Sequence, residues 1–210
     1  MAELKVGRMV IGSVQTNCYF IYREGTSEVI CIDPADHGVQ IATKLEEKGL
    51  KIAAIFLTHG HFDHIWGTKE MREHTGADIY AYIGEKEVLE SASLNISEQV
   101  GRPYTVNADH YLKDGEILTI QDMTCKILAT PGHTQGSCCY YFELDKVLLS
   151  GDTLFQESVG RTDLATGSGA ALVHSIKEKL FTLPEDVKVY PGHGEQTTIG
   201  HELHYNPYCQ

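Results

Sequence analysis

The run THGHFDH at residues 58–64 constrains this chain more than any other feature of its sequence. It places four side chains of metal-binding type within six positions, namely His59, His61, Asp63 and His64. In chains of this composition the pattern His-x-His-x-Asp-His arises by chance in only about 0.1 to 0.2 per cent of cases. Imidazoles combined with a carboxylate match zinc or iron, whereas magnesium and calcium prefer oxygen ligands alone. The run therefore predicts a metal site.

Three more candidate ligands follow apolar runs in the same way as the first four. They are His133 in ILATPGHT, Asp152 in VLLSGDT and His193 in VKVYPGHG. A Pro-Gly pair precedes each of these two histidines and suits a tight turn. Because an α/β scaffold carries its site on turns just past the ends of strands, we expect these side chains to converge with residues 58–64.

The rest of the chain reads as alternating strands and helices. Short apolar runs bounded by turn residues predict strands at 18–22, 28–33, 51–58, 116–120, 124–130, 137–144, 146–150 and 187–192, with a short strand after Gly76. Apolar residues three or four apart predict helices at 39–50, 67–76 and 169–183. Residues 85–106 are polar and are expected to form a helix and then a loop that could act as a lid. No linker interrupts the pattern, so residues 1–210 are predicted to form a single α/β domain.

Composition excludes several classes of partner. The formal net charge of -12 disfavours nucleic acid, because a polyphosphate backbone would be repelled. The first residues lack a charged segment followed by a sustained apolar stretch, and no later stretch approaches the length of a membrane span, so neither export nor a membrane partner is expected. The six cysteines form no CxxC pair and are expected to be small buried hydrophobes in a reducing compartment, which predicts a cytoplasmic location.

The motifs THGHFDH, TPGHT, SGDTLF, GRTDL and YPGHG together resemble the metallo-β-lactamase fold, especially its glyoxalase II-like branch, from residue 16 to the C-terminus. The resemblance implies an αββα four-layer sandwich with two mixed β-sheets flanked by helices. Two-domain glyoxalase II enzymes add a helical C-terminal domain that contacts glutathione. Here 17 residues follow His193, so no separate C-terminal helical substrate domain is expected.

The resemblance also implies a set of ligands for two divalent metal ions. One ion would be held by His59, His61 and His133, the other by Asp63, His64 and His193, and Asp152 would bridge them. Zinc is the expected metal, with iron and manganese as alternatives, since all three accept mixed histidine and aspartate ligands.

The function implied by these ligands is hydrolysis of a thioester or related acyl bond in a small molecule, of the hydroxyacylglutathione hydrolase type. A hydroxide shared by the two metals would be the nucleophile, with Asp63 and Asp152 as catalytic residues. In GRTDL, Arg161 resembles a contact for the carboxylate of the thiol part of the substrate. The alternative for Arg161 is an ordinary salt bridge with Asp163. The oligomeric state stays open.

Two other functions compete with this hypothesis. The same motifs, including GRTD, also resemble those of persulfide dioxygenases. These enzymes use a single iron held by two histidines and an aspartate. A non-catalytic metal-binding scaffold is the third possibility, although purely structural metal sites are usually rich in cysteine. Nucleases are disfavoured by the charge of the chain, and secreted β-lactam hydrolases by the absence of a signal segment. The metal content separates the hydrolase from the dioxygenase.

Several residues outside the ligand set receive a structural interpretation. Asp33 is expected to form a turn, with support of the ligands as the alternative. Glu202 and Asn206 are expected to close the fold, and Trp66 belongs either to the core or to a pocket wall. Surface or capping roles are expected for the remaining histidines, which are His37, His74, His110, His174, His201 and His204.

Overall fold

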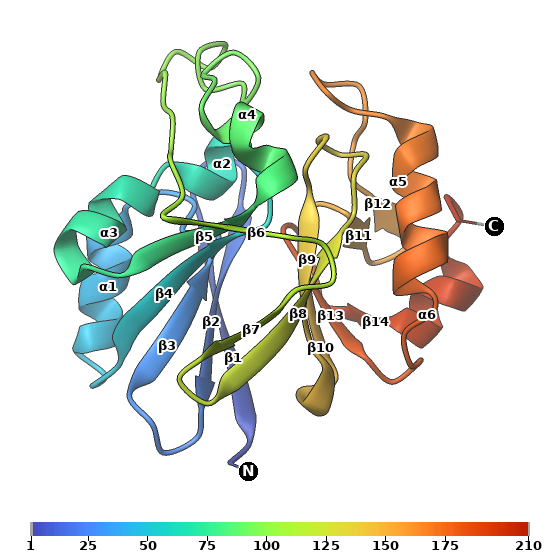
Figure 1. Cartoon of the computed structure of the whole chain (residues 1–210). Coiled ribbons are helices and arrows are strands. Elements are labelled where there is room, and N and C mark those ends of the chain that lie inside the picture. Colours follow the sequence, from blue (N-terminus) through green and yellow to red (C-terminus); the bar gives the residue numbers. More distant parts are fainter. Residues whose placement is uncertain (1, 210) are drawn as a thin grey trace.

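Two six-stranded β-sheets lie face to face in the computed structural model, which describes residues 2–209 (Figure 1). The first sheet contains, in spatial order, β1 Leu4–Ile11, β2 Thr16–Arg23, β3 Glu28–Ile32, β4 Lys51–Leu57, β5 Asp78–Tyr82 and β6 His110–Leu112. The second contains β14 Thr197–Thr198, β13 Lys188–Pro191, β10 Val147–Gly151, β9 Cys138–Phe142, β8 Met123–Ala129 and β7 Ile117–Ile120. A small hairpin of β11 Leu154–Phe155 and β12 Ser158–Val159 follows β10.

Both sheets mix parallel and antiparallel pairs. In the first sheet β1, β2 and β3 pair antiparallel, whereas β3 through β6 run parallel. In the second sheet β10 and β13 are parallel and the other pairs are antiparallel. Candidate ligands follow the carboxyl ends of the parallel strands β4, β10 and β13, and His133 follows the antiparallel strand β8.

Helices cover the outer face of each sheet. They are α1 Gly38–Glu46, α2 Phe62–Ile65, α3 Thr68–Thr75, α4 Lys86–Leu89, α5 Gly169–Ser175 and α6 Ile199–Tyr205. Short 3₁₀ turns span Ile83–Glu85 and Glu143–Asp145, and α5 continues as a π-helical turn over Ile176–Leu180. Figure 1 shows α1 and α3 on the side of the first sheet and α5 and α6 on the side of the second. The predicted αββα four-layer sandwich is confirmed.

The layers follow from the period-two alternation of strand side chains. Phe20 of β2 packs in the cluster that contains Ile41 of α1. Its neighbour Ile21 points the other way and packs in the cluster that contains Tyr140 of β9, between the two sheets. Each strand of the first sheet thereby contributes to two hydrophobic layers at once, and the sheets bury their shared face away from water.

The predicted helix at 169–183 supplies the outermost layer of the second sheet. Leu172, Ile176 and Leu180 are four residues apart and are all fully buried in the cluster against that sheet. The regular α-helix ends earlier than expected, at Ser175, and the next turn is π-helical. The spacing of the apolar residues identified the buried face correctly, but it did not indicate the change of helix type.

Strand β1 and several short elements were not expected from the sequence. Strand β1 pairs with β2 from Leu4 opposite Arg23 to Ile11 opposite Thr16. As an edge strand it is only partly buried, and its apolar alternation is accordingly weak. The hairpin β11–β12 and helix α6 are short elements of two to seven residues that periodicity does not detect.

The C-terminal residues close the fold as expected. The fully buried Glu202 accepts hydrogen bonds from the hydroxyl of Thr197 at 2.5 Å and from the backbone N–H of Glu157 at 2.8 Å. The side-chain amide of Asn206 donates both to Glu202 at 2.8 Å and to the carbonyl oxygen of Ser158 at 3.0 Å. These bonds fasten α6 to the hairpin β11–β12, next to the site described below.

The cysteines behave as small hydrophobes. All six are buried, and none forms a disulfide within residues 2–209. Burial raises the pKa of Cys125 to about 12, so this thiol stays protonated at neutral pH.

No helix within residues 2–209 has the length and the apolar character of a membrane span.

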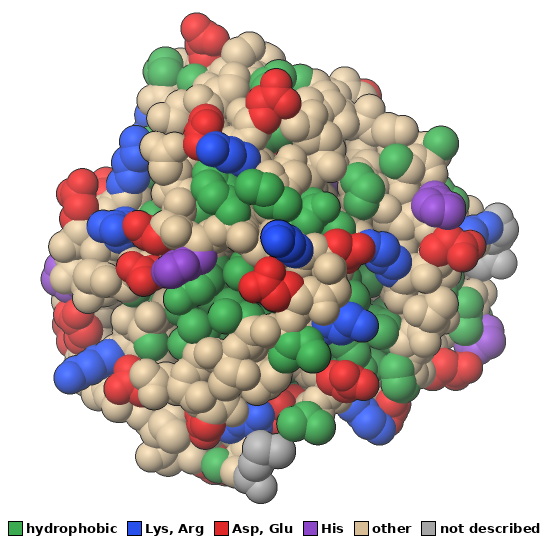
Figure 2. Space-filling model, in the orientation of Figure 1, with side chains coloured by type: hydrophobic (Ala, Val, Ile, Leu, Met, Phe, Trp, Pro, Cys, Tyr) green, Lys and Arg blue, Asp and Glu red, His purple; other side chains and the backbone are tan. Residues whose placement is uncertain are grey.

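Acidic and basic side chains are interspersed on the face drawn in Figure 2. Lys and Arg do not gather there into one broad patch, and apolar side chains are exposed between the charges. On this face, acidic side chains therefore have basic side chains among them.

Candidate metal centre

The seven residues singled out as ligands lie in turns that follow four strands. His59 and His61 follow β4, and Asp63 and His64 lie in α2 directly after them. His133 lies in the turn after β8, Asp152 follows β10, and His193 follows β13. Strands of both sheets thus deliver these side chains to one place, as the sequence predicts.

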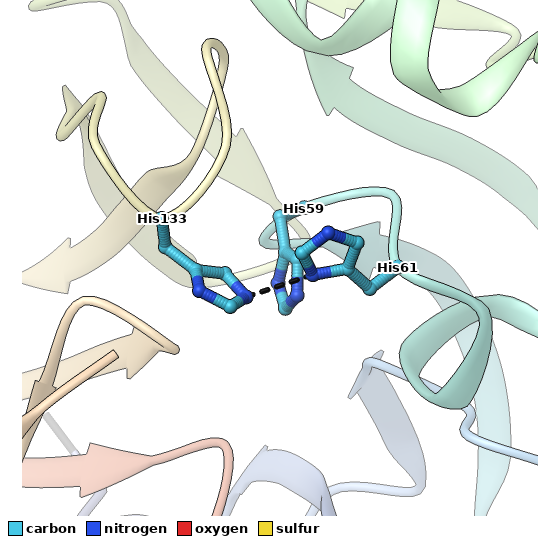
Figure 3. Close-up of side chains that lie close together, drawn as sticks. All are labelled: His59, His61 and His133. Carbon is cyan, nitrogen blue, oxygen red and sulfur yellow. Dashed lines mark hydrogen bonds between the residues drawn. The ribbon is translucent and has the colours of Figure 1, made fainter. Parts of the chain in front are cut away.

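Three of the histidines form one group. Their ligand nitrogens all lie within 4.8 Å of one another, and the three side chains are His59, His61 and His133 (Figure 3). The Nδ1 of His61 and the Nε2 of His133 are 2.8 Å apart. Each of the three residues is at most 3% exposed, so the group is shielded from bulk water.

Asp63, His64 and His193 form a second group, again with their ligand atoms within 4.8 Å. The Oδ2 of Asp63 lies 3.2 Å from the Nε2 of His193 and 3.5 Å from the Nε2 of His64. The hydroxyl of Thr16, at the start of β2, donates to the same oxygen at 2.8 Å and fixes the carboxylate. This group is more open than the first, because the side chain of His193 is 25% exposed.

Asp152 lies between the two groups. Its Oδ2 is 3.5 Å from the Nε2 of His133 and 3.6 Å from the Nε2 of His193. Its Oδ1 is 3.4 Å from the Nε2 of His64. One carboxylate therefore faces members of both groups, which is the position that a bridging ligand requires.

The cluster has the features expected of a metal site. Four of its buried atoms have no hydrogen-bond partner among the described residues, namely the Nε2 atoms of His59, His61 and His64 and the Oδ1 of Asp152. Buried polar atoms without partners are costly, and a bound ion is one of the few ways to satisfy them. The nitrogen and oxygen donors are those that zinc, iron and manganese accept. The cluster could therefore bind metal ions.

The protonation of the cluster also suits metal binding. Burial lowers the pKa of His61 to about 3 and lowers the pKa of His59 well below its usual range, so both imidazoles are neutral. Burial would raise the pKa of Asp152, but His64 and His133 outweigh it and the pKa falls to about 2. Neutral imidazoles and ionised carboxylates are the forms that coordinate metals.

In the second group, His64 carries a proton before a metal ion binds. Although burial opposes it, the carboxylates of Asp63, Asp152 and Asp33 raise the pKa of His64 well above its usual range. A metal ion at this group must displace that proton, since only the neutral imidazole is a ligand.

Asp33 orients His64 and is more than the turn residue that the sequence suggested. Its Oδ2 is 2.8 Å from the Nδ1 of His64, and its two oxygens also accept hydrogen bonds from the backbone N–H and the hydroxyl of Thr58. Asp33 directly follows β3, and its backbone has a φ of 50°. The supporting role left open for Asp33 is the one that its contacts match.

Glu85 was missed by the sequence analysis, although it connects two of the ligand-bearing turns. It is 1% exposed, and its Oε1 accepts from the N–H of Gly60, between His59 and His61, at 2.7 Å. Its Oε2 lies 2.8 Å from the hydroxyl of Thr134, next to His133. Burial raises the pKa of Glu85 to about 8. A lone glutamate in a polar stretch gives no sign of burial, so no local pattern could have identified it.

The glycines of the two Pro-Gly-His turns are required by close packing. A Cβ at Gly192 would lie 2.1 Å from the Oδ1 of Asp152 and 2.7 Å from the Cε1 of His64. A Cβ at Gly132, where φ is 142°, would lie 2.3 Å from the backbone of Leu172. Both turns approach neighbouring atoms more closely than any other residue would allow.

A pocket of about 430 Å³ opens over the cluster. His61, Asp63, His133, Asp152 and His193 form its floor. Its walls consist of Val14, Phe62, Ile96, Phe155, Ser158, Val159, Arg161 and Leu164. The volume is within the range of small-molecule sites, which is about 300 to 1,000 Å³.

Arg161 lines this pocket and is also paired with Asp163. The Nε and one terminal nitrogen of Arg161 donate to the two carboxylate oxygens of Asp163 at 2.7 and 2.8 Å. Both side chains are more than 60% exposed, so the pair is well solvated. The carbonyl oxygen of Arg161 is 2.7 Å from the Nδ1 of His133 and orients that imidazole. Arg161 therefore both forms the salt bridge with Asp163 and lines the pocket.

Trp66 is a wall residue of a smaller neighbouring cavity that also contacts Phe62 and Asp63. The guanidinium of Arg102 lies 4.6 Å from its ring centre. Of the histidines outside the cluster, His74, His110 and His201 pair with surface carboxylates.

Known proteins are similar to this chain over nearly its whole length. The family described as "Metallo-beta-lactamase superfamily" matches residues 11–193. The probable metallo-hydrolase YqgX of Bacillus subtilis is 42% identical over 98% of this chain and 97% of its own length. The hydroxyacylglutathione hydrolase GloC of Haemophilus influenzae is 34% identical over 94% of each chain.

Two solved structures share the architecture closely. The B3 metallo-beta-lactamase BLEG-1 superposes with a TM-score of 0.92 at 40% identity, covering 98% of this chain and 99% of that one. The protein TTHA1623 in a di-iron-bound form superposes with a TM-score of 0.84 at 30% identity, covering 96% of this chain and 99% of that one. The similarity therefore extends over nearly the whole chain in both cases.

Proposed function

The chain belongs to the metallo-beta-lactamase superfamily, and on that premise we propose that it is a two-metal hydrolase that cleaves thioesters or related acyl bonds. The observation that carries the proposal is the position of Asp152 between two groups of ligands on the floor of a pocket. The name of the GloC relative, a hydroxyacylglutathione hydrolase, supports the choice of thioesters.

In this proposal His59, His61 and His133 would hold one ion, Asp63, His64 and His193 would hold the other, and Asp152, which faces both groups, would be available to each. Zinc is the proposed metal, with iron or manganese as alternatives. Of these two alternatives iron is tested first, because TTHA1623 was solved in a di-iron-bound form. When bound, a pair of divalent ions supplies Lewis acidity toward a carbonyl oxygen and lowers the pKa of water towards neutrality.

The residues of the chain contribute position and charge. The ionised Asp63, fixed by Thr16 and facing the pocket, accepts a hydrogen bond from the attacking water and aims its oxygen. Attack forms a bond from the water oxygen to the carbonyl carbon and breaks the C–S bond. The products are a carboxylate and a thiol, and one proton is released to solvent.

The lining of the pocket favours a thiol over an amine as the leaving group. Apart from the proposed ligands, Arg161 is the only ionisable side chain among the described residues that line it. No separate general acid is therefore placed to protonate a leaving amine. A thiolate needs no such donor, because thiols ionise near pH 8.5.

A substrate panel tests the proposed reaction. Protein that has been stripped of metal and reloaded with zinc or iron is assayed on glutathione thioesters, thioesters of other thiols, a lactone, a β-lactam and glutathione persulfide. We expect turnover of thioesters in the metal-loaded protein and none after chelation. Oxygen uptake on the persulfide without thioester turnover would replace the hydrolase with the dioxygenase alternative. Activity on the β-lactam alone would replace the acyl thioester with an amide substrate.

Arg161 is proposed to bind a carboxylate on the thiol part of the substrate. Arg161→Ala is expected to raise the KM of a thioester with such a carboxylate about tenfold, with little change in kcat, because a charge-assisted hydrogen bond is lost from binding. A thioester of a neutral thiol should be unaffected. The measurement is steady-state kinetics on this matched pair of substrates.

Asp163→Asn provides the opposite variant. It frees the guanidinium of Arg161 from its bidentate partner and is expected to lower the KM of the anionic thioester. Equal effects of both variants on the neutral and the anionic substrate would contradict the assignment and leave only the surface salt bridge.

A further inference from the structure

The walls of the pocket are mainly apolar. Six side chains form what we call the apolar wall, and they are Val14, Phe62, Ile96, Phe155, Val159 and Leu164. A water-filled pocket over a polar cluster would cost less free energy with polar walls, because exposed apolar surface is unfavourable. Contiguous apolar surface around a few polar groups is the usual composition of a site that binds an apolar ligand.

The wall has two halves, which come from different parts of the fold. Val14 from the turn between β1 and β2, Phe62 from α2 and Ile96 belong to the side of the first sheet. The N–H of Phe62 donates to the carbonyl oxygen of Asn95 at 3.0 Å, which places Ile96 beside Phe62. The other half consists of Phe155, Val159 and Leu164, in the segment that also carries Arg161.

In the first half of the wall, the backbone of Ile96 is strained. Its φ is 70°, a left-handed conformation that a β-branched residue adopts only under constraint. Strain of this kind is concentrated at functional sites, where the surrounding structure enforces it. The residue is buried to 8% exposure and still lines the pocket.

The two halves of the wall differ in charge. Arg161 is the only lysine or arginine among the described residues that line the pocket, and it lies in the second half. The first half offers no cationic side chain for an anionic or strongly hydrated group. If the thiol part of the substrate lies toward Arg161, as proposed above, the acyl part lies across the cluster, against Val14, Phe62 and Ile96.

We infer that the first half of the apolar wall binds an aliphatic acyl chain, so that the preferred substrates are thioesters of unbranched, medium-length fatty acids and not of short hydroxy acids. This inference rests on the proposed thioester hydrolysis and specifies its acyl group. The reaction is unchanged, since water adds to the acyl carbon and the C–S bond breaks to release the fatty acid and the thiol.

Chain length is the direct test. The metal-loaded protein is assayed on acetyl, butanoyl and hexanoyl thioesters of one neutral thiol, with lactoyl-glutathione alongside. Burial of each methylene is expected to raise kcat/KM about threefold to fourfold, and the four methylenes that separate acetyl from hexanoyl then give about 80- to 250-fold. A flat or falling profile, or a preference for the lactoyl group, in protein that hydrolyses the panel would overturn the inference and leave the proposed function intact.

A matched pair of variants locates the binding surface. Val14→Ser and Val10→Ser make the same change at similarly exposed positions, 47% and 53%, but only Val14 lines the pocket. Val14→Ser is expected to lower the ratio of hexanoyl to acetyl kcat/KM about threefold to tenfold, and Val10→Ser to leave it unchanged. Equal ratios in both variants would remove Val14 from the acyl site.

Binding can be measured without turnover. Alkyl ketones in which a methylene replaces the thioester sulfur cannot be hydrolysed, and their affinities are obtained by calorimetry. Affinity that rises with acyl length supports the inference even if no thioester is cleaved, in which case only the proposed reaction fails. Affinity independent of acyl length would refute the inference on its own.

Discussion

His61→Ala is expected to lower metal content and thioester turnover together, with turnover falling by at least about a hundredfold. His61 is 3% exposed, and its Nδ1 lies 2.8 Å from the Nε2 of His133. Alanine leaves the first group with two of its three imidazoles, so it removes both a ligand and the geometry that the remaining pair supplies. The measurement combines metal analysis of the purified variant with its kcat/KM.

His74→Ala is the matched control for this variant. His74 pairs with Glu46 on the surface at 3.1 Å and lies outside the cluster. The His74→Ala variant should keep full metal content and activity. Unchanged activity in His61→Ala, with the fold intact by circular dichroism, would mean that the three-histidine group is not the metal site.

The second large effect is expected at Glu85. Glu85→Ala should lower the free energy of unfolding by about 2 to 4 kcal/mol, because it leaves the buried N–H of Gly60 without a partner and removes one of the two hydrogen bonds of the Thr134 hydroxyl. The same loss releases the turns that carry His61 and His133 from each other. Metal affinity should therefore fall about 10- to 100-fold, as is typical when the partners of ligand-bearing groups are removed.

The pH dependence of the free energy of unfolding distinguishes the effect of the proton on Glu85 from the effect of the size of its side chain. The pKa of Glu85 is about 8 in the folded protein against 4.5 in the unfolded chain, so folding favours the protonated form. The stabilising contribution of that proton is fully present below about pH 4.5 and is lost as the pH rises towards 8. Glu85→Gln, which keeps a neutral group of the same size, should remove this part of the slope.

Urea unfolding of the metal-free protein between pH 5 and 8 provides the measurement. Glu87→Ala is the control, since Glu87 lies two residues further on in α4, is exposed, and accepts a hydrogen bond from the exposed Gln135 at 3.0 Å. Identical pH slopes for the wild type and Glu85→Gln would show that Glu85 is ionised when buried.

The sequence predicted the cluster because its signals are local and chemical. Four candidate ligands occur within six residues, and the other three each follow an apolar run that forms a strand in the structure. Convergence then depends only on strands ending at a common edge, which is a general property of α/β sheets. The layered architecture was predictable for a related reason, since β2 through β4 are almost continuously apolar.

The residues that support the cluster were not predictable in the same way. Glu85 acquires its role only when the chain brings Gly60 and Thr134 together, 74 residues apart in sequence. For Asp33 the sequence left a turn and a support of the ligands as alternatives, and only the contact with His64 decides between them. Strand β1 was missed because only Leu4 is fully buried and the other residues are partly or fully exposed, so the apolar alternation is weak. Such long-range contacts leave no local pattern in the sequence.

The stoichiometry of metal activation tests the central claim most directly. Zinc or iron is titrated into the metal-free protein while thioester hydrolysis and bound metal are measured in the same samples. We expect hydrolysis to rise until two ions are bound per chain, because Asp152 links two groups of ligands. Saturation of activity at one iron per chain, with oxygen consumed on a persulfide and no thioester cleaved, would contradict the two-metal hydrolase.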